Sequence, residues 1–360
     1  MQVGSRLALF VATVSLLGGV ALGAPPQVET RKNVRVLATG GTIAGAGSNA
    51  GPAYRSGVVS IAEILRSIPG LDSLATISSE QVSNVGSFDV DEIVWRKLLG
   101  RVRAAIADPS IAGVVITHGT DTLEETAFFL SLVIPSAKPV VVVGAMRPGT
   151  AVSADGPHNL LDAVRVAISS EGRNRGVLVV MNDTIFEAAS VTKTDIRRVN
   201  AFAAPIGGPV GDVLSNVPRF YRPAVKSDEG FAVLETPLPR VAVAYAFAGV
   251  KADDIRAAAA GAQGLIIAGM GAGSLSGDAR RAVRELALKG VPVVRTARQG
   301  SGDVWTAVQA GNEQPGTRDT VAGRELSPAK ARILLMLALQ KPRSREEIQS
   351  LFNHFGIVAR

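Results

Sequence analysis

The chain has 360 residues, 47% of them apolar and 19% charged, a length that exceeds one ordinary core and predicts two domains. It contains no cysteine, which excludes disulfides, thiol nucleophiles and thiolate metal sites. The net charge of +7 is spread along the chain without a basic run and with only 4% aromatic residues, so we predict a basic globular protein that binds no nucleic acid.

Residues 1–24 predict a secretory signal peptide. Arg6 precedes an apolar stretch at 7–22, and small residues surround Ala24, after which cleavage is expected. The stretch is short for a membrane-spanning helix, and its glycines Gly18 and Gly19 disfavour an anchor. We therefore expect a periplasmic or secreted protein with no membrane association after signal cleavage.

Strand and helix patterns alternate through the first part of the chain. The segment "VRVLATGGTIAG" (34–45) predicts a buried strand that breaks at Gly40 and Gly41. Further apolar runs predict strands at 113–117, 139–146 and 176–182, and 3.6-residue spacing predicts helices at 123–133 and 160–168. Strands that are apolar throughout and alternate with helices indicate a doubly wound α/β domain with a mainly parallel sheet, at 34–224.

The same pattern returns after a break. Residues 225–240 include a charged patch and two prolines, so we expect a linker there. Beyond it, a smaller doubly wound α/β domain is expected at 241–360. Its apolar runs lie at 241–247, 264–270 and 291–297, and a helical end begins at Pro328.

Polar residues follow two of the predicted strands in the first domain. Thr42 comes after the first strand, and Thr120 and Asp121 come after the strand at 113–117. In open parallel sheets ligands bind beyond the carboxyl ends of the strands, and backbone N–H groups there can hold an anion. Capping of the following helices is the alternative role for Thr42 and Asp121.

Several familiar sites are missing from the sequence. No complete dinucleotide fingerprint, phosphate loop or serine elbow occurs. The three histidines, His118, His158 and His354, are scattered, which supports neither a metal site nor a Ser–His relay. His118 is expected to be a hydrogen-bonded structural residue, and no cofactor is expected.

The sequence is compatible with a reaction at a threonine hydroxyl. A threonine hydroxyl is a weak nucleophile until a neighbouring base removes its proton. Asp121 and Lys193, the latter in the polar segment 181–195, could supply that base. Spacing alone does not decide, because an isolated lysine is usually solvated.

Taken together, the motifs resemble the bacterial L-asparaginase family, in its secreted type II, asparaginase–glutaminase branch. The similarity runs from about residue 34 to the C-terminus and rests on the motifs "ATGGTIAG", "HGTDTLEETA", "GVLVVMNDT", "VTKT" and "LSPAKARILLMLAL". It implies hydrolysis of the side-chain amide of L-asparagine, and of L-glutamine, through an acyl-threonine intermediate. It also implies a homotetramer of intimate dimers, with the active sites at the intimate-dimer interface and without metal or organic cofactor.

The resemblance also implies roles for individual residues. Thr42 matches the nucleophile, Tyr54 the tyrosine of the lid, and Thr120, Asp121 and Lys193 a second catalytic cluster. Ser87, Asp121 and Thr120 match groups that bind the substrate. Glu313, within "GNEQPG", matches the glutamate that a partner subunit contributes.

Two positions depart from the family pattern. Phe88 stands where a Gln or Glu helps to hold the substrate's amino group, and Gly249 stands where a polar residue, often asparagine, reaches the neighbouring site. Two alternatives to an ordinary asparaginase therefore stay open. One is an amidase of the same fold with a shifted substrate preference, and the other is a secreted amino-acid-binding protein without turnover.

Overall fold

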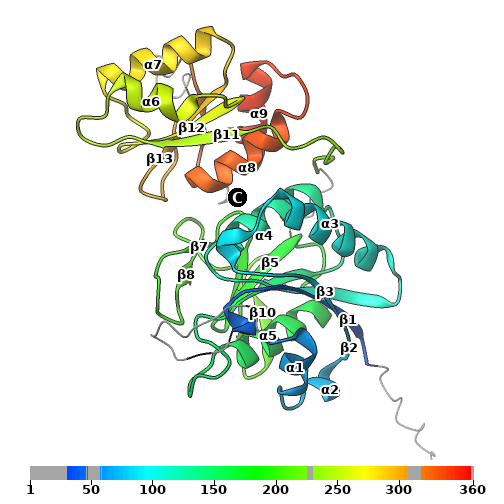
Figure 1. Cartoon of the computed structure of the whole chain (residues 1–360). Helices are drawn as coiled ribbons and strands as arrows, with labels where there is room; N and C mark the ends of the chain where they lie inside the picture. Colours follow the sequence, from blue (N-terminus) through cyan, green and yellow to red (C-terminus); the bar gives the residue numbers. More distant parts are fainter. Residues whose placement is uncertain are drawn as a thin grey trace, which may run out of the picture. The chain divides into compact units, whose positions relative to one another are not determined.

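The computed structural model describes residues 31–45, 47, 57, 59–224, 230–306 and 318–357. Residues 31–360 belong to one compact unit. Its framework consists of an eight-stranded and a four-stranded sheet, accompanied by a two-stranded ribbon (Figure 1). The α/β class with mainly parallel sheets that the sequence predicts is confirmed.

The large sheet has the strand order β10-β9-β6-β5-β4-β3-β1-β2. Its strands are β1 (Asn33–Gly40), β2 (Thr76–Val85), β3 (Ile111–Thr117), β4 (Val140–Val143), β5 (Val177–Met181), β6 (Thr184–Glu187), β9 (Gly211–Leu214) and β10 (Val217–Phe220). Strands β1 to β5 are parallel to one another, and β6, β9 and β10 add antiparallel pairs at one side of the sheet. The carboxyl ends of β1 and β3, which are neighbours, therefore lie at the same edge of the sheet.

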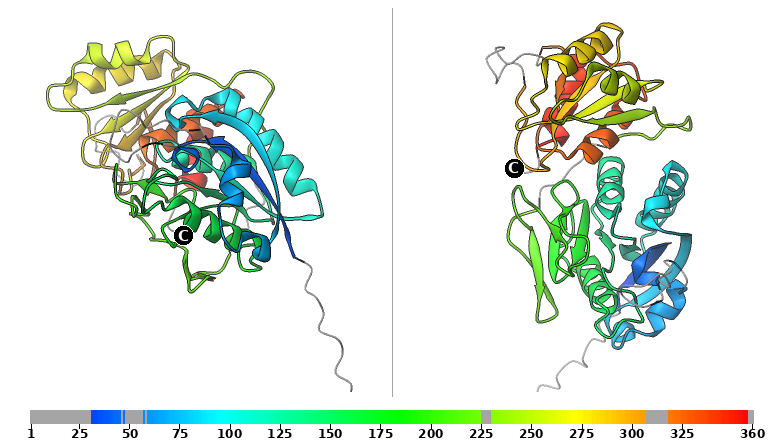
Figure 2. Two further views of the ribbon diagram at one scale, coloured as in Figure 1. Left: turned by 60° about the horizontal axis from the view of Figure 1, so that its bottom comes forward. Right: turned by 60° about the vertical axis from the view of Figure 1, so that its left-hand side comes forward.

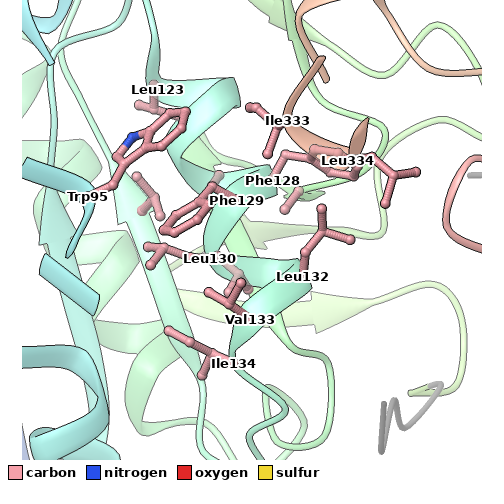
Figure 3. Packing of buried hydrophobic residues seen from close by; sticks show 14 of the residues in the cluster. Trp95, Leu123, Phe128, Phe129, Leu130, Leu132, Val133, Ile134, Ile333 and Leu334 are labelled. Atoms are coloured by element: carbon pink, nitrogen blue, oxygen red, sulfur yellow. The ribbon is translucent and has the colours of Figure 1, made fainter. Parts of the chain in front are cut away.

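Helices cover both faces of this sheet, as Figures 1 and 2 show. They are α1 (Ile61–Arg66), α2 (Leu71–Leu74), α3 (Glu92–Ala107), α4 (Leu123–Val133) and α5 (Gly156–Ile168). Side chains of β3 alternate between two cores: Val114 and Ile116 join the core under α3 and α4, and Val115 joins the core under α5. In the first core Trp95 stacks on Phe129, with their ring centroids 4.8 Å apart (Figure 3).

The small sheet is parallel throughout, with the order β11-β12-β13-β14. Its strands are β11 (Val241–Tyr245), β12 (Gly264–Gly269), β13 (Val293–Ala297) and β14 (Val321–Ala322). Its helices are α6 (Ala252–Ala259), α7 (Gly277–Leu288), α8 (Pro328–Ala338) and α9 (Arg345–Phe355). Ile333 and Leu334 of α8 belong to the same core as Phe128 of α4 (Figure 3), so the core of α4 continues to the small sheet.

The described part of the expected linker is tied to the large-sheet helices. The Phe231 amide donates to the Leu132 carbonyl at 2.8 Å, and the Leu238 amide donates to the Glu92 carboxylate at 2.9 Å. The division into domains at 34–224 and 241–360 stays a prediction. In the part of the chain that the structure describes, none of the helices has the length and apolar character to cross a bilayer.

Candidate active site

Two loops meet in backbone contact at the carboxyl edge of the large sheet. After β1, Gly40 and Gly41 have φ values of 110° and 80°, which side chains other than glycine rarely adopt. A Cβ atom on Gly41 would overlap the backbone of Gly119, which follows β3. This close approach lets the short helix η1 (Thr42–Ala44), and with it Thr42, begin beside the loop that carries Thr120.

The loop after β3 is held by a residue from a third segment. Ser87 begins the short helix η2 (Ser87–Asp89), and its hydroxyl accepts a hydrogen bond from the Asp121 amide at 3.1 Å. Its carbonyl accepts one from the Thr122 hydroxyl at 2.6 Å. Thr120 and Ser87 are buried, whereas the Asp121 carboxylate is exposed. Ser87 and Asp121, which the sequence predicts as substrate-binding residues, are therefore brought together.

Lys193 joins this group across 72 positions of sequence. It lies on β7 (Thr192–Lys193), which pairs with β8 (Phe202–Ala203) in the two-stranded ribbon. Its Nζ donates to Thr120 Oγ1 at 2.9 Å and to Asp121 Oδ1 at 2.7 Å, and its backbone amide donates to Glu124 Oε2 at 2.9 Å. The structure thus assembles an ammonium, a hydroxyl and a carboxylate, a set that can relay a proton.

A buried polar chain supports the loop from below. Trp95 Nε1 donates to Thr126 Oγ1 at 2.9 Å, and this oxygen lies 2.9 Å from His118 Nε2. His118 Nδ1 lies 2.7 Å from the Gly119 carbonyl oxygen. Burial lowers the pKa of His118 to about 4, so the imidazole is neutral at pH 7. The structural role expected for His118 agrees with these contacts.

Lys330 is a second supporting residue, and it was not predicted. Its side chain is buried, and Nζ donates to the Ala189 carbonyl at 3.0 Å and to the Val191 carbonyl, just before β7. Burial lowers the pKa of this ammonium to about 8, against the attraction of Glu124 and Glu125. The ammonium thus fixes the backbone two residues before Lys193. A lone lysine inside the apolar run of α8 was the available signal.

Two predicted residues, Tyr54 and Glu313, lie outside the described residues. The chain on either side of Tyr54 is nevertheless anchored at the site. The Gly57 amide donates to the Gly41 carbonyl at 3.2 Å, and the amide and carbonyl of Gly47 bond to the Thr150 hydroxyl at 3.1 and 2.7 Å. Gly57 therefore lies against Gly41, the residue directly before Thr42.

The two departures from the family pattern are both open positions. Phe88 is 73% exposed, and its ring lies against Gly86, so nothing apolar requires an aromatic group there. Gly249 has φ +85°, and a Cβ atom there would meet no neighbouring atom within 4 Å. The backbone at Gly249 thus favours glycine, although asparagine tolerates this conformation better than most residues.

Comparison with known proteins identifies relatives over almost the whole chain. A model described as "Asparaginase, N-terminal" matches residues 33–226, and one described as "Glutaminase/Asparaginase C-terminal domain" matches residues 240–352. L-asparaginase 2 of Bacillus subtilis is 42% identical over 90% of this chain and 86% of its own length. Glutaminase-asparaginase of Pseudomonas fluorescens is 41% identical over 91% of this chain and 92% of its own length. The crystal structure of a probable cytoplasmic L-asparaginase from Campylobacter jejuni superposes with a TM-score of 0.81, at 38% identity, over 90% of this chain and 99% of that one.

Proposed function

The chain belongs to the asparaginase family, and we propose that it hydrolyses the side-chain amide of L-asparagine, and of L-glutamine, to the amino acid and ammonia. The observation that carries the proposal is the contact of Lys193 Nζ with both Thr120 Oγ1 and Asp121 Oδ1. The first residue of this cluster directly follows Gly119, whose backbone contacts Gly41, the residue before Thr42. Hydroxyl and base are thus present at one sheet edge, as amide hydrolysis requires.

The reaction proceeds through a covalent intermediate on Thr42. Its oxygen forms a bond to the amide carbon, the carbon–nitrogen bond breaks, and ammonia leaves with the proton that Thr42 has lost. Water then attacks the acyl-threonine ester, releases aspartate or glutamate and returns a proton to the Thr42 oxygen. Tyr54 supports the nucleophile from the lid, and Lys193 with Asp121 polarises Thr120 or the attacking water.

Substrate recognition uses the opposite charges of an amino-acid amide. The exposed Asp121 carboxylate attracts the α-ammonium of the substrate. Ser87 and Thr120 offer hydroxyl groups to the α-carboxylate of the substrate. Glu313 from a neighbouring subunit adds a second anion for the ammonium. This last contact requires the intimate dimer. The assembly of two such dimers into a homotetramer belongs to the proposal, together with a two-domain chain joined at 225–240.

The place of action follows from the first 24 residues. An apolar segment with a small-residue cleavage site directs export, so the mature enzyme acts in the periplasm or outside the cell. Mass spectrometry of the protein recovered from a periplasmic fraction of a Gram-negative expression host would find an N-terminus at Pro25. Recovery of the uncut chain only from the cytoplasm would contradict this part of the proposal.

The test of the activity is ammonia release by the purified mature protein. L-asparagine, L-glutamine and their D-isomers are compared for the wild type, Thr42→Ala and Thr42→Ser. We expect release to vanish in Thr42→Ala and to persist at a reduced rate in Thr42→Ser, which keeps a hydroxyl. Equal rates for wild type and Thr42→Ala would reject the nucleophile.

A second candidate, an amidase with shifted preference, is favoured by the exposed Phe88 where a polar residue is usual. It predicts a higher kcat/KM for another amide than for L-asparagine. If no amide is turned over while asparagine still binds in calorimetry, the chain is an amino-acid-binding protein instead.

A further inference from the structure

Three ligand-type side chains converge away from the catalytic cluster. His158 and Asp162 lie on α5, and Asp183 lies in the turn between β5 and β6. His158 Nε2 is 2.6 Å from Asp183 Oδ1 and 3.4 Å from Asp162 Oδ2. One ligand atom from each residue lies within 4.8 Å of the others.

The buried oxygen of Asp162 is the decisive feature. The Asp162 side chain is only 1% exposed, and its Oδ1 accepts a hydrogen bond from Arg165 at 2.7 Å. Its Oδ2 is buried and receives no hydrogen bond from any residue that the structure describes. A buried carboxylate oxygen without a hydrogen bond is unfavourable, and this one faces the His158–Asp183 pair. His158 Nε2 offers at most one hydrogen, and its shorter contact, 2.6 Å, is with Asp183 Oδ1.

The backbone holds the three side chains on rigid elements. His158 and Asp162 are four residues apart on one helix, so both project from the same face. Asn182 and Asp183 adopt left-handed φ values of 50° and 60° in a tight turn. The turn is fixed because the Asn182 amide donates to Asn159 Oδ1 at 3.0 Å and the Val213 amide donates to the Asp183 carbonyl at 2.8 Å.

We propose that His158, Asp162 and Asp183 bind one divalent transition-metal ion of the Zn²⁺ class. A tetrahedral zinc ion with bonds of about 2.0–2.2 Å separates neighbouring ligand atoms by about 3.3–3.5 Å. The 3.4 Å between His158 Nε2 and Asp162 Oδ2 already matches this spacing. The 2.6 Å between His158 Nε2 and Asp183 Oδ1 is shorter, so the exposed Asp183 side chain would move away from the imidazole to admit the ion. Water completes the coordination, and Arg165 orients Asp162 from outside it.

The donor set selects the kind of ion. An imidazole nitrogen favours Zn²⁺, Ni²⁺ or Cu²⁺, whereas Mg²⁺ and Ca²⁺ prefer oxygen ligands alone. The ion would fasten the start of α5 to the β5–β6 turn. Gly156 at the start of α5 packs against Ile43, the neighbour of Thr42, so the site would stiffen the surroundings of the nucleophile without touching the substrate. The sequence predicted no metal site, because its histidines are scattered. Asp183 lies 25 positions from His158 in the sequence and meets it only in the folded chain.

The experiment uses the tag-free mature protein after treatment with a chelator. Titration calorimetry with ZnCl2, MgCl2 and CaCl2 gives the stoichiometry, and thermal unfolding with and without Zn²⁺ gives the shift in Tm. The variants His158→Phe and Asp183→Asn remove one exposed ligand each. Asp278→Asn and His354→Gln are matched controls that remove an acid and a histidine elsewhere.

We expect one Zn²⁺ per chain, a Tm that rises with Zn²⁺ concentration, and no binding of Mg²⁺ or Ca²⁺. Both effects should be lost in His158→Phe and Asp183→Asn and kept in the two controls. Absence of Zn²⁺ binding by the wild type would overturn the proposal and leave only the contact between His158 and Asp183. Unchanged binding by His158→Phe would overturn it equally, because the ion would then occupy another site.

Discussion

The Gly119 carbonyl fixes the tautomer of His118. The carbonyl oxygen of Gly119 can only accept a hydrogen bond, so the His118 Nδ1 at 2.7 Å must carry the proton. The neutral ring then has a bare Nε2, which accepts from the Thr126 hydroxyl at 2.9 Å. Thr126 in turn accepts from Trp95. The orientation of the peptide that leads into Thr120 is therefore set by a chain of three buried side chains.

This buried histidine predicts a pH-dependent stability. Its pKa is lowered from 6.5 to about 4 in the folded chain, so the unfolded chain binds more protons between these values. The contribution of neutral His118 to the free energy of unfolding is complete above pH 6.5 and is lost as the pH falls towards 4. Between pH 7.5 and 5 the free energy of unfolding of the wild type should fall by about 2 kcal/mol more than that of His118→Gln. Urea titrations at one fixed protein concentration measure both, and parallel pH profiles would contradict a neutral His118.

Lys193→Met should abolish most activity while leaving the fold intact. The variant removes the group that contacts Thr120 and Asp121, and proton-transfer groups contribute about 10²–10⁴-fold to rates. Stability should change little, because the Asp121 carboxylate is 59% exposed and remains hydrated. Steady-state kinetics should place the loss in kcat. Lys138→Met is the matched control, and a loss confined to KM would assign Lys193 to binding alone.

Two glycine substitutions should have opposite effects. Gly41→Ala places a Cβ atom on the Gly119 backbone at φ +80°, so it should destabilise the chain by about 2 kcal/mol or more and impair turnover. Gly100→Ala lies within α3, where a Cβ atom meets nothing within 4 Å, and should stabilise by about 0.5–1 kcal/mol. Thermal unfolding ranks the three proteins. A Gly41→Ala variant with wild-type Tm and kcat would disprove the tight approach of the two loops.

Phe88→Gln should improve binding of L-asparagine. A hydrogen bond to a charged group contributes about 1.5–3 kcal/mol, which corresponds to a KM lower by about tenfold or more. The exposed position accepts a polar side chain, so kcat and Tm should change little. Phe88→Leu, which has no polar group, separates a gain in hydrogen bonding from removal of the ring. Equal KM values for the two variants would show that Phe88 does not border the ammonium of the substrate.

Apolar patterning predicted the central strands of the large sheet but not its edge strands. Val140–Val143 are completely buried, and such runs identify β4 and its neighbours directly. The edge strand β2 contains one buried hydrophobic residue, Val82, so its sequence lacks an apolar run. The antiparallel strands β9 and β10 are short and half-exposed and were missed for the same reason.

The site was predicted through resemblance more than through pattern. Thr120 and Asp121 stand out at a strand end, whereas Lys193 could not be placed from spacing because its contacts span more than 70 positions. The supporting residues Thr126 and Lys330 were not predicted. Their polar atoms are buried within apolar helices, and only the fold shows which groups they serve.

The contact between Gly41 and Gly119 sets the spacing of two loops through the backbone. Because it is made by backbone alone, the spacing between the Thr42 and Thr120 loops does not depend on a side-chain conformation. Substitutions at Phe88 or Gly249 should then leave the spacing of Thr42 and Thr120 unchanged. We therefore expect substrate preference and the placement of Thr42 to depend on different residues of this chain.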